Sequence, residues 1–288
     1  MARLPLAAEM TAARFSMTLS GSSKVLHSFA STYSYTRSGG AIPKAGLIDV
    51  NGTLYGTAAL GGNTPDCETG DACGTVFSIT TSGKYTLLHS FGRGADGNVP
   101  QAPLLYVDGS LYGTTTGGGE YGHGTVFSIT PAGDYKTMHS FGSNSNDGSA
   151  PMSALIDVQG ALYGTTAGGG SGNRGTVFSI TTDGSENIFY SFASNGADGV
   201  GPAAALKNVK GVFYGTTTSG GVNDVGTVFE LTKSGKETVL HSFAKGDGVN
   251  PVAGVIAVGG TLYGTTYGSS IYGVKRSFGN VFSLRMLR

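Results

Sequence analysis

The sequence predicts an all-β protein, a five-bladed β-propeller built from four-stranded antiparallel blades. The tetrapeptide Leu/Phe-Tyr-Gly-Thr recurs about every fifty residues, and four short apolar runs accompany each copy. Its tyrosines are Tyr55, Tyr112, Tyr163, Tyr214 and Tyr263. No stretch shows the periodicity of an amphipathic helix. We expect a single domain, residues 1–288, with blades at about 43–91, 100–141, 151–192, 202–243 and 251–284 plus 24–29.

The second copy shows the expected strands most clearly. Strand a covers residues 100–107, and an Asp-Gly turn leads into strand b at 110–116. Strand c covers 124–130, and a Pro-Ala-Gly-Asp turn leads into strand d at 135–141. Alternating apolar residues, β-branched and aromatic enrichment, and flanking Gly, Asp and Asn all favour strands.

The two ends of the chain predict how the ring closes. Residues 252–258, 261–266 and 280–284 would form strands a, b and c of the last blade, and residues 24–29 match strand d. Pairing these segments would remove the exposed edges of the sheet. Residues 15–18 also resemble strand c, so either they or residues 281–284 fill that position.

Connection lengths divide the loops into two kinds. The a–b and c–d connections have the same length in every copy, as from Pro100 to Tyr112 and from Phe127 to Phe141. The b–c and d–a connections differ between copies, and both are longest in the first copy. In an up-and-down blade the two variable kinds share one face, and variable loops on a rigid scaffold commonly carry binding function.

Composition narrows the classes of partner. Charged residues make up 12% of the chain and the net charge is zero, so we expect no binding to nucleic acid. No apolar run reaches the roughly 20 residues that a membrane helix needs, so we expect no membrane insertion. The first residues form no clear signal peptide. We expect a monomer without a cofactor.

The two cysteines, Cys67 and Cys73, lie in one loop rich in Gly and Asp. We interpret them as a local disulfide, which would suit an exported protein. Two free thiols are the alternative. A metal site would need more ligands than this pair supplies.

Several motifs resemble the GloVer tandem repeat, named for Gloeobacter and Verrucomicrobia. They are L-Y-G-T-T-x-x-G-G at 111–119, G-T-V-F-S-I-T at 124–130, L-H-S-F at 88–91 and D-G-x-x-P at 96–100. The resemblance spans roughly residues 15–284. It implies a propeller in an extracellular or periplasmic location, but no activity or catalytic residue. The chain departs from the pattern at Tyr190 (for His), Ala58 (for Thr) and Gly39-Gly40 (for Asp-Gly).

Two repeated polar residues could carry chemistry. One is the histidine of strand d (His27, His89, His139 and His241), and the other is the Asp of Asp-Gly (Asp96, Asp147, Asp198 and Asp247). Strand d is outermost, which spreads the histidines around the rim, so we interpret each as bonded to a backbone group between blades. The Asp residues are interpreted as turn residues. We therefore predict no metal site.

The candidate ligand-binding residues are polar or aromatic residues of the variable loops, together with threonines that end strand b. Solvated loop decoration would produce the same kinds of residue. The candidates are Tyr35, Arg37, Glu120, Tyr121, His123, Asn173, Arg174, Asn223, Asp224, Tyr267, Tyr272, Lys275, Arg276, Thr115, Thr166, Thr217 and Thr266.

These residues favour a non-catalytic binding module for a polar ligand, most readily a glycan, although the absence of Trp leaves stacking on sugars to Tyr. The alternative is a hydrolase or lyase at the mouth of the central channel. In that case Glu120 and Asp224 would be the paired acids, with His123 as proton shuttle. A third reading is a scaffold that binds a protein surface through the same loops.

Overall fold

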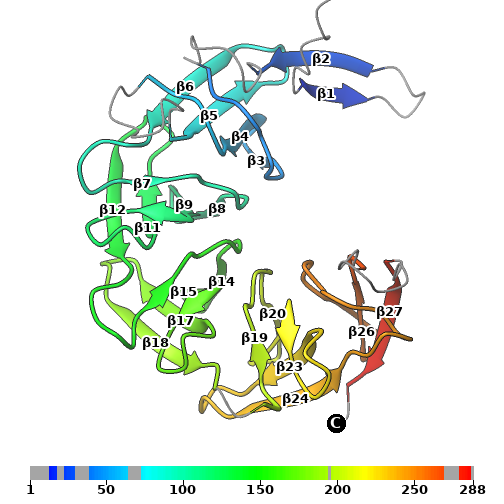
Figure 1. Ribbon diagram of the computed structural model, residues 1–288. Helices are drawn as coiled ribbons and strands as arrows, with labels where there is room; N and C mark the ends of the chain where they lie inside the picture. The colour runs from blue at the N-terminus through cyan, green and yellow to red at the C-terminus, as the bar shows by residue number, and fades with distance from the viewer. Residues whose placement is uncertain are drawn as a thin grey trace, which may run out of the picture.

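The computed structural model describes residues 13–17, 23–29, 39–63, 73–193, 196–268 and 279–286. Within them every assigned element is a β-strand, which confirms the all-β prediction. Four antiparallel four-stranded sheets follow one another along an arc, between a two-stranded sheet at its start and a three-stranded sheet at its end (Figure 1). No helix long and apolar enough to span a bilayer occurs in this part of the chain.

Each complete sheet holds its strands in chain order, with the first strand toward the centre of the arc and the fourth at the rim (Figure 1). The expected strands of the second copy are all present, although strand a is shorter than predicted. The sheets are β3 (Ile48–Val50), β4 (Thr53–Ala58), β5 (Thr75–Thr80) and β6 (Tyr85–Ser90); β8 (Leu105–Val107), β9 (Ser110–Thr115), β11 (Thr125–Ile129) and β12 (Tyr135–Ser140); β14 (Ile156–Val158), β15 (Ala161–Thr166), β17 (Thr176–Thr181) and β18 (Glu186–Ser191); and β20 (Lys207–Val209), β21 (Val212–Thr217), β23 (Thr227–Leu231) and β24 (Glu237–Ser242).

Tight hairpins join the first two strands of each sheet. In the second copy Val107 pairs with Ser110, so the loop is the two residues Asp108 and Gly109. Their φ angles are 48° and 84°. Positive φ at both positions defines a type I′ turn, whose twist matches that of the flanking strands. This geometry explains why glycine stands at the second loop position in every copy.

The two variable kinds of connection lie on one side of the arc, because they pair with each other. A short strand in a d–a connection pairs with a short strand in the next b–c connection. The pairs are β7 (Gly97–Asn98) with β10 (Gly117–Gly118), β13 (Gly148–Ser149) with β16 (Gly168–Gly169), and β19 (Gly199–Val200) with β22 (Ser219–Gly220). We call this side the variable face.

Aromatic side chains hold neighbouring sheets together at what we call the seams. Phe91, which follows β6, packs on Phe127 of β11 with ring centroids 5.2 Å apart. Tyr55 is buried in the same hydrophobic cluster, which also contains residues of the next sheet. Tyr112, Tyr163 and Tyr214 lie in or against the corresponding clusters, so the tyrosine of the repeated tetrapeptide helps to form the core between these sheets.

The ends of the chain show only part of the predicted pairing. Strand β2 (Ser23–Ser28) pairs with β1 (Ala13–Met17), whereas β25 (Ile256–Val258), β26 (Thr261–Thr265) and β27 (Val281–Arg285) form a separate three-stranded sheet. Both candidate c strands therefore form, each in its own sheet. Closure of the ring by residues 24–29, and hence a count of five blades, is not confirmed. Figure 1 shows the gap between β27 and the β1–β2 hairpin.

The glycine of the repeated tetrapeptide tests this packing. A Cβ atom at Gly113 would lie 2.5 Å from Cζ of Phe127 and 2.9 Å from Cδ2 of Leu104. We expect Gly113→Ala to lower the free energy of unfolding by about 1–3 kcal/mol, because overpacking forces the buried ring aside. Urea denaturation measures the change.

Gly246 is the matched control, because a Cβ there meets no atom within 4 Å and its φ is compatible with alanine. We expect Gly246→Ala to change the free energy of unfolding by no more than about 0.5 kcal/mol. Equal effects of the two substitutions would contradict this account of the seam.

Candidate functional site

A polar pair occupies the rim end of four of the five seams between described sheets. His89 Nε2 lies 2.9 Å from Asp96 Oδ2, and His241 Nε2 lies 2.7 Å from Asp247 Oδ2. Where Tyr190 replaces histidine, its hydroxyl donates to Asp198 Oδ2 at 2.8 Å. The prediction that the histidines bond to backbone groups was wrong in these copies. Their partner is the Asp of the following Asp-Gly.

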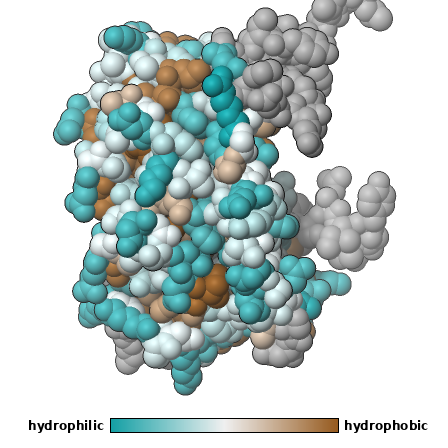
Figure 2. Space-filling view, turned by 90° about the vertical axis from the view of Figure 1, so that its left-hand side faces the viewer, coloured by the Kyte–Doolittle hydropathy of each residue, from teal (hydrophilic) through white to brown (hydrophobic). Residues whose placement is uncertain are grey.

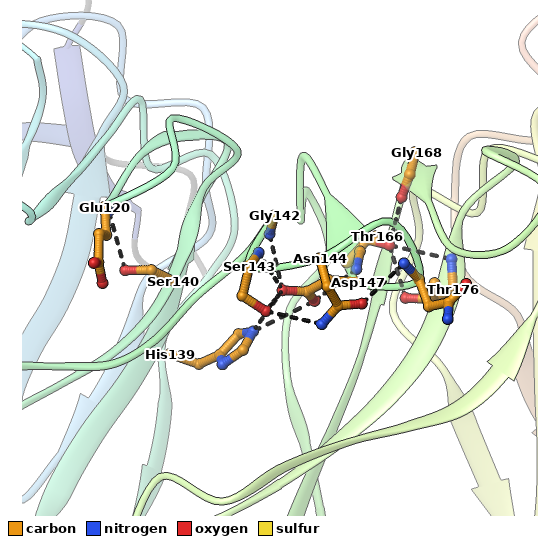
Figure 3. A network of polar contacts seen from close by, with 12 residues as sticks. Glu120, His139, Ser140, Gly142, Ser143, Asn144, Asp147, Thr166, Gly168 and Thr176 are labelled. Carbon is orange, nitrogen blue, oxygen red and sulfur yellow. Dashed lines mark hydrogen bonds and ion pairs between the residues drawn. The ribbon is translucent and has the colours of Figure 1, made fainter.

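The same Asp residues organise the d–a loops. The carboxylate of Asp147 accepts hydrogen bonds from the amides of Gly142, Ser143 and Gly148, and from the Ser143 hydroxyl (Figure 3). Burial by itself would raise the pKa of Asp147, but the hydrogen bonds from His139 and Ser143 lower it to about 2. Asp147 is therefore ionised at neutral pH.

The first seam shows what happens without the acid. Gly39 stands where the other copies have Asp, and Nε2 of His27 is buried with no hydrogen-bond partner among the described residues. The His27 ring stacks on Tyr85 with centroids 4.0 Å apart. Burial lowers the pKa of His27, because desolvation disfavours the charged imidazolium.

The fourth strand of each complete sheet brings a further residue to the seam before it. In the first two complete sheets this residue is Tyr, and Tyr85 stacks on His27 at 4.0 Å and Tyr135 on His89 at 3.9 Å. It is Glu186 or Glu237 in the next two. Burial, as the largest cause, raises the pKa of each glutamate to about 7. Oε1 of each is buried without a hydrogen-bond partner.

His139, Asp147 and Glu186 converge at the seam between the β8–β12 and β14–β18 sheets. One donor atom from each lies within 4.8 Å of the other two, and among the described residues only this group could supply three metal ligands. Glu186 is not among the residues predicted from the sequence, because it comes from the next module. The available signal was that Glu186 aligns with Tyr85 and Tyr135 of the other copies.

A pocket of about 390 Å³ opens on the variable face beside Asp147. It brings together two predicted residues, His123 of the β10–β11 connection and Asn173 of the β16–β17 connection. The amide of Ala150 donates to the carbonyl of His123 (2.8 Å), which fixes this loop against the next module. The remaining lining residues come from Asp147 and its surroundings: Gly142, Asn144, Ser145, Gly148, Ser149 and Gly169.

A second hollow, of about 350 Å³, lies at the following seam and is lined by Asp198, Glu237 and His241, among others. Figure 2 shows the outer side of the arc, where hydrophilic side chains predominate and the apolar patches are separate. The described rim is therefore a polar surface with hollows at the seams.

The predicted threonines do not face a ligand. Thr115, Thr166 and Thr217 are fully buried. Each hydroxyl lies 2.8 Å from the hydroxyl of a threonine on the neighbouring strand, Thr125, Thr176 or Thr227. Thr266 is also buried, and its hydroxyl accepts from the amide of Asn280. We therefore assign these four threonines a structural role and not a ligand-binding one. The side chain of a residue at the end of a strand in a packed seam points into the protein.

The predicted pair of acids is not assembled. Glu120 belongs to the β8–β12 sheet and Asp224 to the β20–β24 sheet, with the β14–β18 sheet between them (Figure 1). Oδ1 of Asp224 accepts from the amide of Gly220 at 3.0 Å, within a turn where Asp224 has a φ of 54°. Asn173 makes the equivalent bond to Gly169, and Asn223 donates to the carbonyl of Phe243.

The remaining predicted ligand-binding residues and cysteines are exposed, engaged in contacts within the fold, or outside the described residues. Tyr121 and Tyr267 are exposed, by 45% and 75%, and remain available to a ligand. The carbonyl of Arg174 accepts from the amide of Gly201. Cys73 is disulfide-bonded. Tyr35, Arg37, Tyr272, Lys275, Arg276 and Cys67 lie outside the described residues.

The chain is similar to a family of repeat proteins and, at low identity, to several solved structures. The model of a family described as the Gloeobacter/Verrucomicrobia repeat matches residues 8–206. No curated protein matches the chain. Among solved structures, YjhT is 15% identical over 78% of this chain and 73% of its own, with a TM-score of 0.43.

Two further solved structures are similar at the same low level. A gluconolactonase from Xanthomonas campestris is 14% identical over 86% of this chain and 74% of its own, with a TM-score of 0.48. A β-xylosidase/α-arabinofuranosidase from a compost microbial metagenome is 14% identical over 87% and 92%, with a TM-score of 0.38. These values are too low to transfer a function.

The buried glutamate of the second hollow predicts a pH dependence. Burial and the charge of Asp198 raise the pKa of Glu237 from 4.5 to about 7. Between pH 4.5 and 7, Glu237 therefore keeps its proton in the folded protein and loses it in the unfolded chain. The stability that this provides is full below pH 4.5 and is lost as the pH rises through 7. We expect Glu237→Gln to be more stable than the parent by about 1 kcal/mol at pH 8, allowing for partial solvation.

The two proteins should differ little at pH 4.5, where both side chains are neutral. Thermal unfolding at the two pH values measures this difference. Glu120→Gln is the control, because Glu120 is exposed, and it should change stability equally at both pH values. A Glu237→Gln variant without a pH-dependent gain would contradict the prediction.

Proposed function

The chain belongs to the Gloeobacter/Verrucomicrobia repeat family, and we propose that it is a non-catalytic binding protein that recognises glycans through its variable face. The pocket beside Asp147 carries this proposal. Its volume of about 390 Å³ falls within the range of small-molecule sites, about 300–1,000 Å³. Its walls offer the side-chain hydroxyls and amides of Ser145, Ser149, Asn144 and Asn173, groups that suit the hydroxyls of a sugar.

An aromatic side chain stands in the same loop. Tyr121, two residues before His123, is 45% exposed. Tyrosine presents a flat apolar face and a polar tip, which suits the ring of a sugar. We assign Tyr121 the stacking contact and the pocket residues the polar contacts.

The arrangement of the acids favours binding over hydrolysis. Glycoside hydrolysis needs two carboxyl groups roughly 5–10 Å apart. Glu120 and Asp224 belong to sheets that are not neighbours, and the turn amide of Gly220 holds Asp224. His123 therefore serves the ligand as a wall of the pocket and not as a proton shuttle.

Repetition of the seams would add avidity. The pairing of d–a with b–c connections recurs at three successive seams, so related loops are presented side by side. Linked weak sites can bind a polymeric ligand far more tightly than one site. We place the protein outside the cytoplasm as a monomer, which suits the disulfide bond of Cys73.

A closed five-bladed ring is the second part of the proposal. Val281 on β27 is 80% exposed, whereas its counterpart Val126 on β11 is fully buried by its neighbours. Closure by residues 24–29 would cover the β25–β27 sheet and end the open edge.

Engineered cysteines test the closure. In complete sheets Ser128 pairs with Lys136, and by the repeat Ser283 would pair with Lys24 in a closed ring. We expect Ser283→Cys combined with Lys24→Cys to form a disulfide within the chain, seen by mass spectrometry after oxidation. The Ser283→Cys variant is the control. Failure of the pair to oxidise would overturn the closure.

The test of glycan binding begins with a glycan array and continues by calorimetry on the sugars that bind. We expect Ser145→Trp, which fills the pocket, to abolish binding, and Tyr121→Ala to weaken it about tenfold, or about 1.4 kcal/mol. Tyr106→Ala is the matched control, since Tyr106 is also exposed (40%) but lies next to the a–b turn.

Two outcomes would contradict the proposal. Equal losses in Tyr121→Ala and Tyr106→Ala would remove the pocket from the binding site. Release of shortened sugars on incubation with the protein would show catalysis instead of simple binding.

A further inference from the structure

We propose that His139, Asp147 and Glu186 bind a divalent transition-metal ion that joins two neighbouring modules. This inference is independent of glycan binding. The imidazole comes from β12, Asp147 from the loop before β13, and Glu186 from the start of β18. The ion would therefore lie at the seam between two sheets and link residues of both.

The geometry is close to that of a coordination site. One donor atom of each residue lies within 4.8 Å of the other two. Ligands about 2.1 Å from a metal lie roughly 3–4 Å from one another, so binding requires the three groups to approach by about 1 Å. Glu186 is the first residue of its strand, and the imidazole of His139 can turn about its side-chain torsions. Small side-chain rotations would therefore bring the three groups to coordination distance.

An unsatisfied atom points to a missing partner. Oε1 of Glu186 is buried without a hydrogen-bond partner, an arrangement that costs free energy in an apolar surrounding. Asp147 is nearly inaccessible, with 3% of its side chain exposed. A cation between the two carboxylates would satisfy the orphaned oxygen and offset the negative charges.

The distance between His139 and Asp147 also leaves room for a metal ion. Nε2 of His139 lies 3.4 Å from Asp147 Oδ2, whereas His89 and Asp96 are 2.9 Å apart and His241 and Asp247 are 2.7 Å apart. The distance is thus longest at the seam where a glutamate faces the pair.

The donor set selects the class of metal. One imidazole and two carboxylates suit Zn²⁺ or Mn²⁺, whereas Ca²⁺ takes six to eight oxygen ligands. Three protein ligands leave coordination positions for water. The amides and hydroxyl that bond to Asp147 would orient it, as second partners commonly orient metal ligands.

The neighbouring seams provide natural controls. At the seam before, Tyr135 stands in place of Glu186, beside His89 and Asp96. At the seam after, Tyr190 stands in place of the histidine, beside Asp198, and Glu237 acts on both electrostatically. Each of these seams lacks one ligand of the three, so only the middle seam should bind the ion.

The experiment uses the full chain without an affinity tag, freed of metal by a chelator. Zn²⁺ and Mn²⁺ are each titrated by calorimetry, and elemental analysis after dialysis gives the stoichiometry. We expect one ion per chain and a higher melting temperature with the ion than without it. Glu186→Gln should weaken binding at least tenfold.

Tyr190→His is a test by gain of function, because it completes a second set with Asp198 and Glu237. We expect this variant to bind two ions per chain. His89→Gln is the matched control, since it removes a histidine from a seam without the glutamate, and it should leave binding unchanged.

Three results would overturn the proposal. They are no binding of either metal by the parent protein, undiminished binding by Glu186→Gln, and a loss in His89→Gln equal to that in Glu186→Gln. Melting temperatures without metal show whether each variant is folded, so a loss of binding is attributed to the site only in a folded protein.

Discussion

Each module depends on one aromatic contact with the next. The phenylalanine after every outer strand packs on the phenylalanine of the next sheet's third strand, and the five centroid distances lie between 5.0 and 5.2 Å. A single module cannot bury its own apolar face, so stacking supplies the core. The glycine of the repeated tetrapeptide belongs to this contact, because a side chain at Gly113 would collide with the ring of Phe127. Uniform spacing of the seams follows from this shared contact.

The polar residues beside this aromatic contact differ from seam to seam. The outer strand places a His or Tyr beside the same phenylalanine, as the edge contact of His139 with Phe141 at 4.7 Å shows. Position and orientation are thus common to all copies, whereas the partners change. Among the described residues Gly39 leaves His27 without an acid, Tyr190 replaces the imidazole by a hydroxyl that donates to Asp198, and Glu186 adds a second carboxylate. Single substitutions within a repeat therefore give each seam its own chemistry.

Asp147 connects the two proposals. Its carboxylate lines the pocket on the variable face and also belongs to the cluster with His139 and Glu186. The same group holds the amides of its own loop. A ligand in the pocket and an ion at the seam would thus share one ordered loop, because the loop that lines the pocket is anchored at the seam.

The sequence by itself determined the strands, the type I′ hairpins and the division between constant and variable connections. These features follow from local patterns that every copy repeats, such as the glycine at the position of Gly109 and the spacing from Phe127 to Phe141. Only the tertiary structure decided what lies across a seam. It paired His89 with Asp96, buried Thr115, brought Glu186 to His139 and separated Glu120 from Asp224. It also paired β2 with β1. The physical reason is that these contacts join residues of different segments, whose meeting depends on how whole sheets stack and not on the propensity of any one stretch.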